Sequence, residues 1–140
     1  MRRAAAFTAL VAVANYEPGG VKVFDSVTLD LVADIPSAVG PDGKRAKVVG
    51  LEDTTGRRFV FSQFETGEIS MVDLADSTSP KITRFGVVGK QPYDALITPD
   101  GRDYGHAIGQ VWHELAVHHV QVQCPHAGSF QTRHFVGQMA

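Results

Sequence analysis

The stretch that decides the fold is ALVAVANYEPGGVKVFD, residues 9–25, because it recurs as RRFVFSQFETGEISMVD at residues 57–73. The two stretches align without a gap, 48 residues apart, with apolar positions over apolar positions. Three identities fall in register, namely Glu17 with Glu65, Gly19 with Gly67, and Asp25 with Asp73. A repeat period of roughly 20–50 residues is typical of solenoids and propellers. The repeat therefore has to be explained by any proposed fold.

Each repeat has the pattern of a strand pair joined by a glycine turn. Val21–Val23 and Ile69–Met71 alternate with period two, as half-buried strands do. Glycines in the intervening turns supply the positive φ that tight hairpins need. Further strands are expected at 9–15, 29–35, 48–51 and 81–85, and a turn at 41–43. The pattern predicts an all-β fold, a β-propeller of four-stranded blades, with Asp25 and Asp73 in structural roles.

A third repeat begins near Gln91, since LITPDGR at 96–102 matches LEDTTGR at 51–57. An alternating strand follows Arg57, but we find no comparable strand after Arg102. We therefore predict a partial propeller over residues 1–103, with about two blades and the start of a third. A propeller closes by packing its last blade on its first, so such a fragment is expected to be marginally stable or aggregation-prone alone.

Residues 104–140 differ in composition from the rest of the chain. All six histidines, the single tryptophan and the single cysteine lie there, with one arginine and no lysine. One interpretation is a non-matching tail, frameshifted or disordered, and the other is a divergent C-terminal extension. No metal site is predicted, because His113-Glu114 is followed by histidines at i+5 and i+6 rather than at the i+4 spacing of H-E-x-x-H.

Composition excludes several classes of protein. A net charge of −2 with no basic face gives no reason to expect nucleic acid, and 44% hydrophobic residues are ordinary for a globular domain. No apolar run reaches the roughly 18 residues that span a bilayer. Residues 1–14 fit a very short secretory signal, but the repeat favours a strand over residues 9–15.

Three stretches, at 13–25, 43–53 (GKRAKVVGLED) and 89–102 (GKQPYDALITPDGR), resemble the NirF family of haem d1 biosynthesis proteins. That family belongs with the d1-domain propellers, which include cytochrome cd1 nitrite reductase and NirN. The resemblance covers residues 3–103 and starts inside the family's chain. It implies a fragment of an eight-bladed periplasmic propeller that binds dihydro-haem d1 and takes part in its dehydrogenation to haem d1 for denitrification. NirN and the nitrite reductase are the implied partners.

The resemblance also directs attention to particular residues. A haem d1-type tetrapyrrole carries several carboxylates, so its site needs cations. Lys47 and then Arg45 are the substrate-binding candidates, because the resemblance places the start of the strand at 48–51 beside the tetrapyrrole. The alternative is a solvated basic loop. Asp94 is a weak catalytic candidate, with a structural hydrogen-bonding role as its alternative.

No histidine stands in the regular part of the chain, and the resemblance places the family's important histidine upstream of the match. The fragment alone is therefore expected to be inactive. A second hypothesis is a non-enzymatic propeller fragment that only binds protein. The stretch at 89–102 favours the first hypothesis, a fragment of a haem d1 biosynthesis protein.

Overall fold

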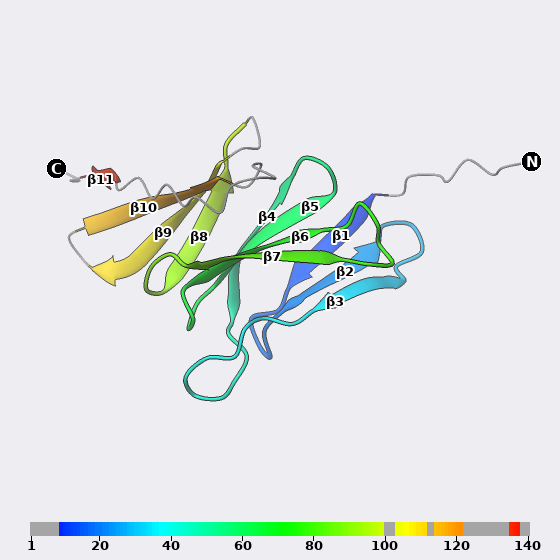
Figure 1. The fold of residues 1–140 in the computed structure, drawn as a ribbon, viewed down its shortest axis with the longest axis horizontal. Coiled ribbons are helices and arrows are strands. Elements are labelled where there is room, and N and C mark those ends of the chain that lie inside the picture. The colour runs from blue at the N-terminus through cyan, green and yellow to red at the C-terminus, as the bar shows by residue number, and fades with distance from the viewer. Residues whose placement is uncertain (1–8, 100–102, 112–113, 122–134, 138–140) are drawn as a thin grey trace, which may run out of the picture.

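The computed structural model describes residues 9–99, 103–111, 114–121 and 135–137 of the 140-residue chain. These residues form three antiparallel sheets in which each strand pairs with the next one in sequence (Figure 1). Sheet 1 contains β1 (Leu10–Ala14), β2 (Val21–Asp25) and β3 (Leu31–Ile35). Sheet 2 contains β4 (Val48–Thr54), β5 (Arg58–Gln63), β6 (Glu68–Asp73) and β7 (Lys81–Val87). Sheet 3 contains β8 (Pro92–Ile97), β9 (Asp103–Val111), β10 (Glu114–Gln121) and β11 (Phe135–Gly137).

The hydrogen bonds of sheets 1 and 2 reproduce the sequence repeat. The N–H of Ser26 donates to Ala9 O at 3.0 Å, and the equivalent N–H of Leu74 donates to Arg57 O at 3.0 Å. The carboxylates after β2 and β6 accept equivalent bonds, Asp25 from Val27 N at 2.8 Å and Asp73 from Ala75 N at 2.9 Å. The structural role predicted for both aspartates is confirmed, and β1 is the expected strand within residues 9–15.

The glycines of the two hairpin turns cannot be replaced without strain. Gly19 and Gly67 have φ angles of 86° and 70°, and a Cβ on them would overlap Ala46 O and Gly89 O respectively. Such left-handed conformations favour glycine. Leu29 also has a positive φ, 61°, so β3 begins at Leu31 and not at residue 29 as predicted.

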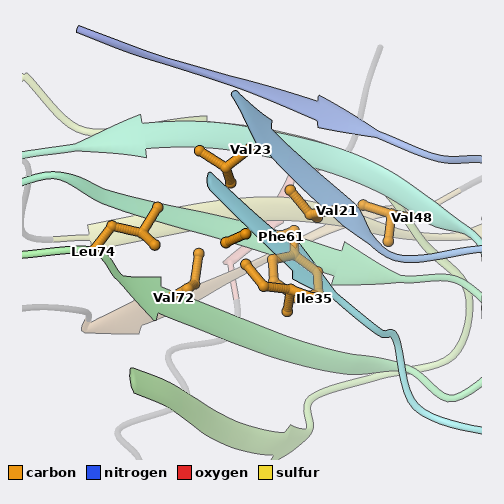
Figure 2. Close-up of a cluster of buried hydrophobic side chains, with 8 residues drawn as sticks. Val21, Val23, Ile35, Val48, Phe61, Val72 and Leu74 are labelled. Atoms are coloured by element: carbon orange, nitrogen blue, oxygen red, sulfur yellow. The ribbon is translucent and has the colours of Figure 1, made fainter. Parts of the chain in front are cut away.

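Two hydrophobic clusters hold the sheets together. The first lies between sheets 1 and 2, and Figure 2 shows side chains from both converging in it. Its buried members are Val21, Val23, Ala33, Ile35, Val48, Phe61, Val72 and Leu74. The second lies between sheets 2 and 3 and contains Val60, Ile69, Ala95 and Tyr104. Sheet 2 is therefore covered on both faces, which is how propeller blades pack.

Sheet 3 extends further than the sequence predicted. The expectation that no comparable strand follows Arg102 is wrong, because β9, at residues 103–111, pairs with β10, at residues 114–121. Tyr104 is fully buried, and its Oη lies 2.7 Å from Ser62 Oγ and 3.3 Å from Gly50 O in sheet 2. The sequence DYGHAIGQV lacks the alternating large apolar residues that identify a strand. The origin of residues 104–140 stays a prediction.

Candidate functional site

Lys47 lies on the segment that crosses from sheet 1 to sheet 2. Its carbonyl accepts the N–H of Phe64 at 2.9 Å, and its neighbour Val48 donates to Asn15 O at 3.4 Å. Ala46, on its other side, is fully buried and donates to Ala38 O at 2.8 Å. The backbone of Lys47 is therefore fixed between the hairpin ends of both sheets.

Two glutamates from equivalent turns face the Lys47 side chain. Glu65 Oε2 accepts the Lys47 backbone N–H at 2.7 Å, while its Oε1 lies 3.4 Å from Nζ. Glu17, the repeat equivalent of Glu65, lies 3.8 Å from Nζ and is 75% exposed. The ring of Tyr16 lies 5.0 Å from Nζ, within cation–π range. The side-chain contact with Glu65, followed by Tyr16, raises the pKa of Lys47 above its ordinary value.

Lys47 and Arg45 line one cavity of about 680 Å³. The remaining lining residues are Glu17, Pro18, Asp42, Lys44 and Glu65. The predicted turn at 41–43 forms one wall, with Gly43 at φ 76° and Asp42 accepting the N–H of Lys44 at 3.0 Å. The structure thus brings the two predicted substrate-binding residues together.

The cavity mixes charges in a way that the sequence did not reveal. Three cations face three carboxylates, and Glu17, Asp42 and Glu65 were not predicted to belong to the site. The signal that was available is the repetition of Glu17 as Glu65. Within the described part of the chain, the ammonium of Lys47 is already engaged, whereas the exposed side chains of Lys44 and Arg45 form no ion pair. Lys44 and Arg45 therefore present the positive charge available to an incoming carboxylate.

Tyr93 connects this region to sheet 3. Its ring meets that of Phe64 edge to face, with centroids 6.3 Å apart, and it remains 57% exposed. Asp94, the weak catalytic candidate, lies in β8, but its side chain is outside the described residues. The prediction for Asp94 therefore stays untested.

Among the described residues, no three or more His, Cys, Asp or Glu side chains are grouped so that they could hold a metal ion. This statement does not cover the histidines of residues 104–140, because their side chains are not among those described. No helix in the described ranges is long and apolar enough to cross a membrane.

The three antiparallel meander sheets are those expected of propeller blades. The family model described as Cytochrome D1 heme domain matches residues 8–124, and the chain belongs to this family. Within it, the chain is similar to Protein NirF of Stutzerimonas stutzeri and of Pseudomonas aeruginosa, with 53% and 56% identity over 113 residues. The predicted resemblance to the NirF family is confirmed. Each alignment covers 74% of this chain and 29% of the relative, so the chain spans less than a third of those proteins.

A solved structure supports the same fold. The chain is similar to the dihydro-heme d1 dehydrogenase NirN in complex with DHE, with a TM-score of 0.62 and 25% identity. The match covers 81% of this chain and 23% of NirN. The predicted all-β propeller fragment is confirmed, with strands β9 to β11 added to the predicted start of a third blade.

Proposed function

We propose that this chain is part of a periplasmic haem d1 biosynthesis protein that binds dihydro-haem d1 and takes part in its dehydrogenation to haem d1. Membership of the d1 haem family and the identity to Protein NirF support the biosynthetic role. The similarity to NirN supports the substrate. NirN and cytochrome cd1 nitrite reductase are the proposed partners, in denitrification.

The observation that carries the proposal is the meeting of Lys44, Arg45 and Lys47 at one cavity on the crossover between two sheets. Arg45 suits a tetrapyrrole carboxylate because a guanidinium can donate two parallel hydrogen bonds to it. The cavity lies within the range of roughly 300–1,000 Å³ typical of ligand sites and would hold the carboxylate edge of the macrocycle. Lys47 supplies a further positive charge whose position is fixed by Glu65.

Absorbance titration with dihydro-haem d1 tests this proposal on the full-length protein that contains the chain. Arg45→Ala is expected to weaken binding by about 10-fold, as expected for loss of a charge-assisted hydrogen bond. Lys47→Ala is expected to weaken it less, since Glu65 and Glu17 already share its charge. Arg84→Ala, on exposed β7, is the matched control and should bind normally. An unchanged absorbance spectrum in the unmodified protein would sink the proposal.

The alternative is a propeller fragment that only binds protein. Exposed apolar side chains on sheet 1, such as Val11 and Val13 at 44% each, favour it. The same titration separates the two functions, since a protein-binding fragment gives no tetrapyrrole signal.

A further inference from the structure

The segment between β3 and β4 contains a small hairpin that carries Lys44 and Arg45, and Figure 1 shows it as a loop projecting from the sheets. We call residues 38–46 the crossover hairpin. At its base, the N–H of Ala46 donates to Ala38 O at 2.8 Å. An isolated antiparallel bridge joins Arg45 to the opposite leg. The positions of the two cations therefore depend on where the base of the crossover hairpin is held.

The side chain of Gln63 holds one leg of this hairpin against sheet 2. Gln63 ends β5 and is 1% exposed. Its Oε1 accepts the N–H of Ala38 at 2.6 Å, and its Nε2 donates to Ser70 Oγ at 3.0 Å. A buried amide costs free energy unless it is hydrogen-bonded, and this one has a partner at each end. The amide is therefore fixed in one orientation, with its acceptor directed at the hairpin.

The β1–β2 turn of sheet 1 packs against the same base. A Cβ on Gly19 would overlap Ala46 O and would lie 2.6 Å from Ser37 Oγ, so this close approach requires glycine. Ser37 and Ala46 are themselves buried, at 5% and 0% exposure. The base of the crossover hairpin thus contacts both sheets, and Gln63 supplies a polar attachment on the side of sheet 2.

The repeat indicates that glutamine is not required to form this strand end. Asn15 is the equivalent of Gln63 in sheet 1, and its side chain is shorter by one methylene. The strand and its turn therefore form with either amide. The additional length of Gln63 allows its Oε1 to reach Ala38, which lies 25 residues earlier in the chain. The contact with the crossover hairpin, and not the strand, accounts for the glutamine.

We propose that Gln63 is a positioning residue of the proposed tetrapyrrole site. It does not line the cavity, and it acts by holding the crossover hairpin so that Lys44 and Arg45 face the carboxylates of the ligand. Without its bond to Ala38, the hairpin occupies the binding-competent position for a smaller fraction of the time. The apparent Kd rises by the inverse of that fraction. This role rests on the proposed function, which supplies the ligand.

Absorbance titration of the full-length protein that contains the chain with dihydro-haem d1 tests this role. Gln63→Met keeps the length of the side chain but removes both hydrogen bonds. It should weaken binding by about 5-fold, the loss typical of one neutral hydrogen bond. Val72→Ala, at a fully buried position of the same sheet, is the matched control for loss of stability and should bind normally. Circular dichroism checks that both variants fold.

A double-mutant cycle separates positioning from a general loss of stability. In a Lys44→Ala/Arg45→Ala background, Gln63→Met should weaken binding by less than about 2-fold, because the crossover hairpin then carries no cation to position. Hydrogen exchange of the Ala38 amide should be faster in Gln63→Met than in Val72→Ala. The exchange measurement needs no tetrapyrrole.

If Gln63→Met does not fold, Gln63→Asn replaces it, because the repeat has asparagine at this position and the shorter amide falls short of Ala38. Failure of the unmodified protein to bind dihydro-haem d1 overturns the proposed function and, with it, this role. Three results overturn the positioning role alone when the unmodified protein binds: equal affinity in the Gln63 variant, equal losses in both backgrounds, or unchanged exchange at Ala38.

Discussion

Sheets 1 and 2 contain the same repeated unit in two different surroundings. In sheet 2, β5 is buried on both faces, with Val60 and Phe61 at 0% and 1% exposure. In sheet 1, the equivalent β1 packs on one face only, and Val11 and Val13 remain 44% exposed. Strand β4 has no equivalent in sheet 1 among the described residues. The comparison teaches that local sequence determines the strands and turns, whereas neighbouring sheets determine how much each side chain contributes to stability.

The largest expected difference is between Phe61 and its repeat equivalent Val13. Phe61→Ala should lower the free energy of unfolding of the full-length protein that contains the chain by about 3–5 kcal/mol, because it leaves a cavity in the core between sheets 1 and 2. Val13→Ala should cost about 0.5 kcal/mol or less, as is usual for exposed positions. Urea unfolding followed by circular dichroism measures both. Similar losses at the two positions would mean that another segment covers this face of β1.

Substitution of the turn glycines should destabilise the protein to a similar extent in both sheets. Gly19→Ala and Gly67→Ala should each cost more than about 1 kcal/mol, because both positions have positive φ and a Cβ at either would overlap a carbonyl oxygen. The same urea experiment applies. A harmless substitution in one sheet only would show that its turn relaxes freely, and the two hairpins would no longer be equivalent.

The two glycines also illustrate what the sequence could predict. Repeat, turns and alternation are local properties, so the propeller class and most strands followed from the sequence. Tyr104 could not be predicted as a core residue, because its burial depends on Ser62 and Gly50 in another sheet. The outer strand predicted for residues 29–35 included Leu29, whereas the turn after β2 gives Leu29 a positive φ.

A smaller difference is expected between Asp73 and Asp25. Burial raises the pKa of Asp73, but the Ala75 N–H and the Arg58 guanidinium outweigh it and hold that pKa below the ordinary 3.8. A carboxyl group whose pKa is lower in the folded state than in the unfolded state stabilises the fold at pH values above its unfolded-state pKa. This contribution is lost as the pH falls through the folded-state pKa. Asp73→Asn should therefore cost about 1 kcal/mol at neutral pH and progressively less below about pH 4.

Asp25→Asn is the matched control for Asp73→Asn. It removes a carboxylate that accepts the same kind of backbone bond, but Leu10 stands where sheet 2 has Arg58. Whatever it costs at neutral pH does not involve the Arg58 guanidinium, which is bonded to Asp73. Thermal unfolding across a pH series compares the variants, and an equal pH dependence would exclude Arg58 as the source of the difference.

The smallest expected difference concerns the two glutamates that face Lys47. Glu65→Gln should lower the pKa of Lys47 more than Glu17→Gln does, because Glu65 is nearer and less exposed. A lysine whose pKa is higher in the folded state than in the unfolded state stabilises the fold at pH values below its unfolded-state pKa. This contribution is lost as the pH rises through the folded-state pKa. Any effect on stability should therefore be present at neutral pH and disappear in strong alkali. An NMR pH titration of the Lys47 side chain would show an equal effect if the two glutamates were interchangeable.

The candidate site was predictable only in part. The basic run at 44–47 is visible in the sequence, and the structure places its cationic side chains at one cavity. The partners of Lys47 come from turns 30 residues before it and 18 residues after it in Glu17 and Glu65, so their proximity depends on the packing of two sheets. The sequence pattern gives no direct measure of that packing.

The position of Lys47 on the crossover has a consequence for assembly. Its cavity exists only while the turns of both sheets lie beside the same short segment. A molecule bound there would stabilise the contact between the two sheets, since separating the sheets would destroy its binding site. By mass action, a ligand that binds only the docked arrangement favours that arrangement by RT ln(1 + [L]/Kd). Ligand binding and the docking of neighbouring blades would then be thermodynamically coupled.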